Sequence, residues 1–210
     1  DGDKNIADLI DMGCWSKKHQ LGSKKNIQLL IEEGVIKFED QQFNIADLPM
    51  HGKHNLSNVI IAMYATSLHG IDPKDSFLAL KNSKGVKRRF ENVFQNNNKM
   101  VIDDFAHHPT AISHTVEAAV NHFPAQRILG IIELASNTMS QGHHGKDLYK
   151  SASGLEKVYW LNVSSKKNME FEYDSIKLLI SDLKKDIENF DVILIMSNKD
   201  SKKISEPIID

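Results

Sequence analysis

The stretch Val101–Ile112 most constrains the fold of this chain, because a short apolar strand ends there in two carboxylates and two imidazoles. Pro109 lacks a backbone N–H and disfavours helical backbone at His108, so a helix should begin at about Pro109 or Thr110. The helix then carries an apolar stripe at the spacing of a face packed on a sheet: Ile112, Thr115, Val116, Ala119 and Val120. Strand, polar turn and helix form half of a βαβ unit, and open parallel sheets bind ligands at this end of the strand. The alternative is that Asp103 and Asp104 only cap or solvate the turn.

Nearly continuous apolar runs follow this helix, at residues 127–132, 157–163 and 192–196. Strands that are apolar on both faces belong to parallel sheets covered by helices on both sides. Helices are expected between them, at about 145–153 and 174–189, and a hairpin from Phe90 to Asp103 comes before. The pattern predicts an α/β fold with a Rossmann-like, doubly wound, mainly parallel sheet. Polar residues at its strand ends should share one rim: Asp103, Asp104, Glu133 to Asn137, Asn162, Ser197 and Asn198.

The first part of the chain gives weaker signals. Residues 1–22 show no clear period and are expected to form loop and solvated surface. Residues 26–45 suggest an antiparallel meander. An apolar period predicts a helix at about 56–69, and Asp72-Pro73 predicts a second helix as far as about Lys81. We expect the domain boundary between Gly85 and Arg88.

Two polar clusters in this region are candidate binding sites. If Asn55 caps the first helix, Asn58 lies at its third position, and two amides offer the donors and acceptors that an adenine edge requires. The alternative is that Asn55 only caps and His54 only packs. Lys87, Arg88 and Arg89 form a dense basic cluster that suits phosphate, or else a solvated surface.

Composition narrows the class of protein. Lys and Arg number 26 against 28 Asp and Glu, so no global basic field favours a nucleic-acid partner. The single Cys14 cannot form an internal disulfide, which fits a reducing compartment. No apolar run approaches the length of a membrane span, so the cytoplasm is the expected location. The chain begins at Asp1 rather than Met, which suggests a piece of a longer protein.

Four motifs occur in order along the chain: HGKHNLSN at 51–58, GVKRRFE at 85–91, VIDDFAHHPTAI at 101–112 and IELASNTM at 132–139. Together they resemble the Mur ligase family. The resemblance implies that residues 1–86 are the C-terminal part of a central ATPase domain and that 87–210 are a C-terminal Rossmann-like domain. The phosphate-binding loop G-x-x-x-x-G-K-S/T is absent from the chain and should lie upstream, with most of the magnesium ligands.

The resemblance also implies a reaction. Members of the family use ATP and Mg²⁺ to convert a carboxylate into an acyl phosphate, which an amine then attacks. The motifs are most similar to the branch that joins L-Ala-γ-D-Glu-meso-diaminopimelate, the murein tripeptide, to UDP-N-acetylmuramate in peptidoglycan recycling. The branch that adds L-alanine to UDP-N-acetylmuramate is the alternative. Neither a nucleic acid nor a membrane is an expected partner, and the sequence does not predict an oligomeric state.

The family motifs assign roles to individual residues. Those expected near adenine are His54, Asn55 and Asn58. Arg89 is expected on the phosphate or ribose side of the nucleotide, and Asp104 on the ribose hydroxyls. His107 would face the amine substrate as the catalytic residue. Those expected to line the peptide site are Ser136, Asn137 and Thr138.

The chain departs from the family pattern at two places. Leu134-Ala135 replaces a proline and an arginine, and the residues after Asn198 lack a glycine-rich stretch. These departures leave a non-catalytic binding domain as one alternative. A metal-dependent hydrolase is another, because carboxylates and imidazoles in one cleft suit a divalent ion. Its ligands would come from Asp103, Asp104, His107, His108, His143 and His144.

Overall fold

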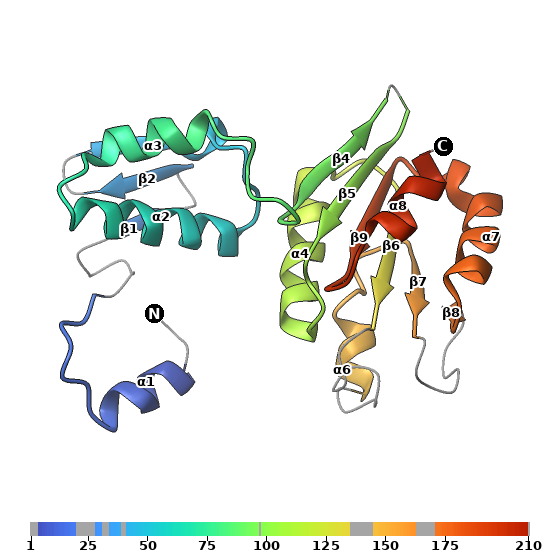
Figure 1. Ribbon diagram of the computed structural model, residues 1–210, viewed down its shortest axis with the longest axis horizontal. Coiled ribbons are helices and arrows are strands. Elements are labelled where there is room, and N and C mark those ends of the chain that lie inside the picture. Colours follow the sequence, from blue (N-terminus) through green and yellow to red (C-terminus); the bar gives the residue numbers. More distant parts are fainter. Residues whose placement is uncertain are drawn as a thin grey trace. The chain divides into compact units, whose positions relative to one another are not determined.

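The fold was obtained as a computed structural model (Figure 1), which describes residues 4–19, 28–30, 34–38, 41–96, 98–134, 145–162 and 171–209. The chain divides into two compact units. Unit 1 comprises residues 1–49 and 53–84, and unit 2 comprises 50–52 and 85–210. The division after Lys84 lies close to the boundary expected from the sequence. The assignment of 1–86 and 87–210 to two ligase domains stays a prediction.

Unit 1 is a small antiparallel sheet with helices. Its elements are α1 (Lys4–Asp11), β1 (Gln28–Leu30), β2 (Val35–Phe38), β3 (Gln41–Asn44), the 3-10 turn η2 (Ile45–Asp47), α2 (Lys53–Ser67) and α3 (Pro73–Lys81). The strands pair in the order β1-β2-β3, which confirms the expected meander. The expectation of loop throughout 1–22 was wrong. Ile6, Leu9 and Ile10 lie at the i, i+3, i+4 spacing of a helix, and α1 forms there.

The start of α3 follows from its local sequence, whereas α2 begins earlier than the sequence predicted. Asp72 caps α3, because its carboxylate accepts the Lys74 N–H at 2.8 Å and Pro73 occupies the first turn. Helix α2 begins at Lys53, three residues earlier than the sequence period suggested. Asn55 therefore lies inside the first turn of α2, and the expectation that it would be the N-cap was wrong.

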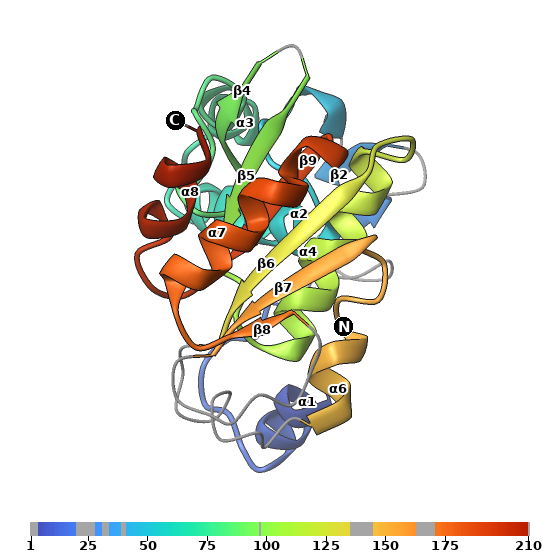
Figure 2. The ribbon, with the colours of Figure 1, turned by 90° about the vertical axis from the view of Figure 1, so that its right-hand side faces the viewer.

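Unit 2 is a six-stranded sheet in the order β4-β5-β9-β6-β7-β8 (Figure 2). Its strands are β4 (Glu91–Gln95), β5 (Met100–Asp104), β6 (Ile128–Glu133), β7 (Lys157–Leu161), β8 (Glu172–Tyr173) and β9 (Val192–Met196). Only the β4–β5 hairpin is antiparallel among the pairs of this sheet; the other pairs are parallel. The α/β fold with a mainly parallel sheet is thus confirmed. The short edge strand β8 was not predicted.

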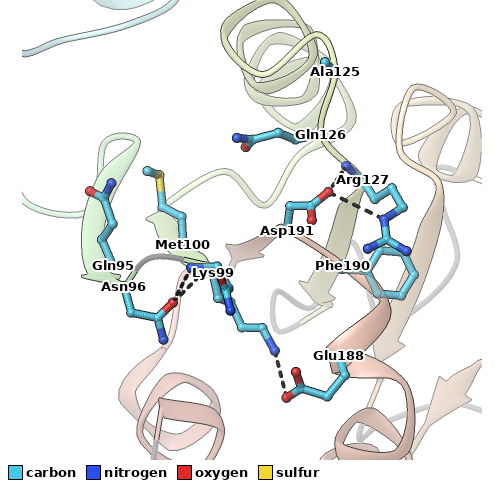
Figure 3. Close-up of a pocket in the computed structure, with 11 residues that line it drawn as sticks. Gln95, Asn96, Lys99, Met100, Ala125, Gln126, Arg127, Glu188, Phe190 and Asp191 are labelled. Atoms are coloured by element: carbon cyan, nitrogen blue, oxygen red, sulfur yellow. Dashed lines mark hydrogen bonds and ion pairs between the residues drawn. The ribbon is translucent and has the colours of Figure 1, made fainter.

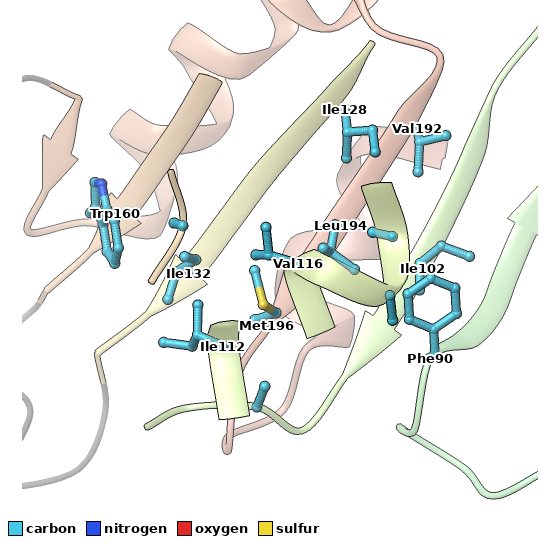
Figure 4. Close-up of a cluster of buried hydrophobic side chains, with 14 of the residues drawn as sticks. Phe90, Ile102, Ile112, Val116, Ile128, Ile132, Trp160, Val192, Leu194 and Met196 are labelled. Carbon is cyan, nitrogen blue, oxygen red and sulfur yellow. The ribbon is translucent and has the colours of Figure 1, made fainter. Parts of the chain in front are cut away.

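Helices cover both faces of this sheet. They are α4 (Pro109–His122), α6 (Gly145–Lys150), α7 (Ile176–Asp186) and α8 (Lys202–Ile209), with the 3-10 turn η3 (Ile187–Asn189) after α7. Ile112 and Val116 of α4 belong to one buried cluster beside Ile132, Leu194 and Met196 of the sheet (Figure 4). Leu148 of α6 is part of the same cluster. Leu179 of α7 and Ile204 of α8 belong to a second cluster.

The position of α4 follows from the residues that start and line it. It begins at Pro109, with His108 in extended backbone as the N-cap, as Pro109 requires. The predicted stripe is buried except at Val120, which is 37% exposed. Because β5, β6 and β9 are parallel neighbours, their carboxyl ends meet at one edge of the sheet.

Candidate functional site at the carboxyl edge of the sheet

The polar strand ends form one connected edge. Strand β9 lies between β5 and β6, with Met196 paired to both Asp104 and Ile132. Beyond β9, the Ser197 amide donates to the Asp104 carbonyl at 3.1 Å, and the Ser197 hydroxyl donates to the Glu133 carboxylate. The expected rim is confirmed for its described residues. Residues 135–137 lie outside the described part of the chain.

Both carboxylate oxygens of Asp104 accept hydrogen bonds from other parts of the fold. It is 1% exposed, and it points to the α4 side of the sheet. One carboxylate oxygen accepts the Phe90 N–H at 2.8 Å, and the other accepts the Ala106 N–H at 2.7 Å and the Thr115 hydroxyl at 3.2 Å. Asp104 therefore ties the turn before β4 and the loop after β5 to α4. Its expected contact with ribose stays a prediction.

Asp103 points to the opposite side of the sheet. One oxygen of its carboxylate accepts the Ser201 hydroxyl at 2.7 Å and the Arg88 Nε–H at 3.3 Å. Its other oxygen, Oδ1, is buried and has no hydrogen-bond partner among the described residues. Burial raises the pKa of Asp103, and the Ser201 hydrogen bond and the Arg88 charge oppose that rise.

The basic cluster lies on a strained turn before β4. Arg88 has φ +57° and Phe90 has φ +55°, both in the left-handed region, which costs of order 1 to 3 kcal/mol for each such residue. The turn is held from several directions. The Arg88 N–H donates to Glu91 Oε2 at 2.7 Å, and the Arg88 carbonyl accepts the Phe105 N–H at 2.8 Å. Arg88 also donates from Nη2 to the Ser197 carbonyl at 2.5 Å.

Phe105 lies between the basic turn and His107. The guanidinium carbons of Arg88 and Arg89 lie 5.1 Å and 5.8 Å from its ring centroid, a cation–π distance. The His107 ring meets the same phenyl ring edge-on, with centroids 5.2 Å apart. Arg89 and His107 thus both contact Phe105. Arg89 is exposed and His107 is half-buried.

Hydrogen bonding fixes the tautomer of neutral His107. Its Nδ1 lies 2.8 Å from the Phe105 carbonyl oxygen. A carbonyl oxygen can only accept, so Nδ1 must carry the proton of this bond. In the neutral ring, Nε2 is then left as the acceptor. The His107 ring can therefore take up a proton at Nε2.

Sequence reasoning missed two residues that organise this edge. Phe105 was treated only as part of a motif, yet it contacts Arg88, Arg89 and His107. The aromatic position beside two carboxylates was the available signal. Arg88 was treated as a possible phosphate ligand, whereas its guanidinium is bound to Asp103 and Ser197.

The residues expected near adenine belong to unit 1. Asn55 is buried at 5% exposure, and Asn58 one turn later is exposed, so the two amides differ in their access to a ligand. His54 is half-buried. The adenine assignment stays a prediction. Ser136, Asn137 and Thr138, expected at the peptide site, lie outside the described residues.

The proposed metal centre of a hydrolase does not form from the acidic pair. Asp103 bonds Ser201 before α8, and Asp104 bonds Thr115 in α4, so adjacent strand positions direct the two carboxylates to opposite faces. Within the described ranges, no group of three His, Cys, Asp or Glu side chains could hold a metal ion. His143 and His144 fall outside those ranges.

A cavity of about 600 Å³ lies at the opposite, amino edge of the sheet (Figure 3). Its charged residues are paired with one another. Lys99 contacts Glu188 at 3.0 Å, and Arg127 contacts Asp191 at 3.5 Å. The cavity contains none of the residues predicted to bind a substrate, so we place the candidate site at the carboxyl edge.

A doubly wound, mainly parallel sheet with polar side chains at its carboxyl edge defines an α/β domain of the ligand-binding class. Residues 88–199 match the family described as Mur ligase, glutamate ligase domain, and the chain belongs to the Mur ligase family. Members of this family are ATP-dependent ligases that form amide bonds. Family membership therefore favours a ligase over the hydrolase alternative.

Two curated relatives resemble the chain to a similar degree. Identity is 30% over 167 residues with the UDP-N-acetylmuramate–L-alanyl-gamma-D-glutamyl-meso-2,6-diaminoheptandioate ligase of Escherichia coli strain K12, covering 77% of this chain and 36% of that protein. Identity is 31% over 156 residues with the UDP-N-acetylmuramate–L-alanine ligase of Christiangramia forsetii, covering 71% and 33%. The chain thus spans about a third of these relatives.

A solved structure agrees with this assignment. The crystal structure of a murein peptide ligase from Psychrobacter arcticus 273-4 matches with a TM-score of 0.71 and 26% sequence identity. The match covers all of this chain and 49% of that protein. In the described residues, none of the helices has an apolar stretch long enough to cross a membrane.

Proposed function

We propose that this chain is part of an ATP-dependent ligase that joins the murein tripeptide L-Ala-γ-D-Glu-meso-diaminopimelate to UDP-N-acetylmuramate. Residues 1–86 would end the central ATPase domain, and residues 87–210 would form the C-terminal domain. The observation that supports this most is the Arg89–Phe105–His107 arrangement at the carboxyl edge. An exposed cation and a possible proton acceptor thus both contact one aromatic ring.

The proposed reaction has two steps. A carboxylate oxygen of the sugar attacks the γ-phosphorus of ATP, which forms an acyl phosphate and releases ADP. The peptide amine then attacks the acyl carbon, phosphate leaves, and the nitrogen loses a proton. Such chemistry depends on positioning and on neutralising phosphate charge. Magnesium ligands are expected upstream, and the enzyme is expected in the cytoplasm, where its nucleotide substrates occur.

The residues of this chain have separate roles in the proposal. Arg89 binds a phosphate or the ribose side of the nucleotide through its guanidinium. His107 accepts the amine proton at Nε2, since its Nδ1 is held by the Phe105 carbonyl. Asn58, with His54 and Asn55, lies near adenine. Ser136, Asn137 and Thr138 line the peptide site.

The test is a ligation assay with the full-length protein that contains this chain. ATP, UDP-N-acetylmuramate and the tripeptide should give UDP-N-acetylmuramoyl tripeptide, which mass spectrometry detects. One ADP and one phosphate should form for each molecule of this product. His107→Gln should lower kcat roughly 100-fold with little change in the ATP KM. His69→Gln, at an exposed site of unit 1, is the matched control.

L-Alanine as the amine substrate is the second candidate, because identity to an L-alanine ligase is as high as that to the tripeptide ligase. Competition between the two amines at equal concentration separates the candidates. Preferential formation of UDP-N-acetylmuramoyl-L-alanine would contradict the tripeptide proposal. Absence of product from either amine would contradict the ligase proposal and favour the non-catalytic binding domain.

A further inference from the structure

Arg88 joins three parts of the carboxyl edge that are distant in sequence. Its guanidinium donates to Asp103 at the end of β5 and to the Ser197 carbonyl after β9. Its backbone carbonyl accepts the Phe105 N–H in the loop after β5. Arg88 is only partly exposed, with 28% of its side-chain surface accessible. The side chain therefore acts inside the fold, and it is not free to reach a ligand.

The Arg88–Asp103 pair is a poor source of stability. Asp103 is 5% exposed, and its Oδ1 atom has no partner among the described residues. A buried ion pair with incomplete hydrogen bonding repays little of the cost of removing its charges from water. What the pair does in the structure is to fix the position of a side chain. It fixes the side chain of Arg88, whose backbone is left-handed, at the end of β5.

The same geometry decides where Arg89 lies. The residues on either side of Arg89 are both left-handed, and Asp104 holds the second of them by accepting the Phe90 N–H at 2.8 Å. Adjacent carboxylates on opposite faces of β5 thus anchor opposite ends of one short turn. Between the anchors, Arg89 is exposed and lies against Phe105.

We propose that Arg88 and Asp103 are positioning residues, which hold the strained turn so that Arg89 presents its guanidinium to a phosphate group of the nucleotide. This inference rests on the proposed ligase function. Arg88 acts through Arg89 and touches no substrate. Loss of the pair lets the turn relax toward ordinary backbone, and the guanidinium of Arg89 then moves away from the edge.

The experiment compares Asp103→Asn, Arg88→Gln and the double variant in the full-length protein. Asp174→Asn, an exposed carboxylate in unit 2, is the control. The KM values for ATP, UDP-sugar and peptide are measured with kcat and the melting temperature. Hydrogen exchange of the Phe105 amide, measured on the 210-residue chain, reports whether the turn is still closed.

Each single variant should raise the ATP KM about tenfold or more, because small displacements of a positioned group have large effects. The KM values for the other substrates should change less than twofold. The double variant should be no worse than either single, since the two residues act as one unit. Asn at 103 keeps an oxygen that can accept both the Ser201 hydroxyl and the Arg88 Nε–H, so Asp103→Asn removes only the charge of the pair, and its melting temperature should fall less than that of Arg88→Gln.

Three results would overturn the inference. They are an unchanged ATP KM in the singles, additive effects in the double, and a parallel rise of all three KM values with a lower melting temperature. The last result would mean a purely structural role. Failure of the wild-type protein to ligate would instead contradict the proposed function, while Phe105 exchange would still report on the turn.

Discussion

Replacing Asp104 by Asn tests how the carboxyl edge is held together. The substitution keeps the size and shape of the side chain and converts one carboxylate oxygen into an N–H donor. The remaining oxygen can still accept the Ala106 N–H and the Thr115 hydroxyl. The new amide donor then faces the Phe90 N–H, so two donors meet in a buried place.

The expected loss follows from that geometry. A hydrogen bond to a charged group contributes about 1.5 to 3 kcal/mol, and Asp104→Asn removes one of three. For a unit of this size, 1 kcal/mol corresponds to roughly 4 °C, so the melting temperature should fall by about 6 to 12 °C. Thr115→Val removes the longest of the three bonds, and it should cost less, about 0.5 to 1.5 kcal/mol.

Trp160 offers a local signal for the assay, because it is buried in the core of unit 2, whereas Trp15 is exposed. Urea unfolding followed by tryptophan fluorescence and by circular dichroism gives the free energy of unfolding for each variant. Asp174→Asn makes the same chemical change at the surface and should stay within about 0.5 kcal/mol of wild type. If Asp104→Asn unfolded like wild type, Asp104 would not hold the turn, and its carboxylate would be available to ribose.

Three further predictions concern this chain and the full-length protein that contains it. The isolated 210 residues should show no ligase activity and at most weak ATP affinity by calorimetry, because the phosphate-binding loop is not in them; robust tripeptide ligation would refute the domain assignment. Ala135→Arg in the full-length protein should lower the peptide KM, because a guanidinium pairs with a peptide carboxylate; an unchanged or higher KM at fixed ATP would mean that this loop does not bind it. Burial and the nearby His122 lower the pKa of His51 below 6.5, so the unfolded state takes up its proton first and stability should fall as pH drops below about 6.5. The difference between the free energies of unfolding at pH 7 and pH 5 should be smaller for His51→Gln than for wild type, and His69→Gln is the control.

The sequence by itself determined the class of fold and the edge of the sheet at which its polar strand ends meet. Continuous apolar runs such as Val192–Met196 predict strands buried on both faces, and the helices expected between them favour parallel pairing. Parallel strands place their carboxyl ends together, so Asp104, Glu133 and Ser197 had to share one edge. The order of the four motifs was enough to identify the family, which the match over 88–199 confirms.

Some features were within reach of the sequence and were missed. The apolar spacing in α1 was overlooked because the segment is short and lies among lysines and glycines. The alternation of side chains along a strand already implied that Asp103 and Asp104 face opposite sides of the sheet. That alternation alone argues against a metal ion shared by the two carboxylates.

Only the tertiary structure decided which groups each side chain of the edge would meet. Arg88 contacts Ser197, which is 109 positions away, and Ser201 reaches Asp103 across 98 positions. These contacts exist because β9 inserts between β5 and β6, an order that apolar periodicity does not encode. The left-handed backbone of Arg88 and Phe90 is likewise imposed by long-range hydrogen bonds, since neither residue prefers it locally. The local sequence pattern predicts where strands and their polar ends occur. The pairing of distant charged side chains depends on the order in which the strands join the sheet.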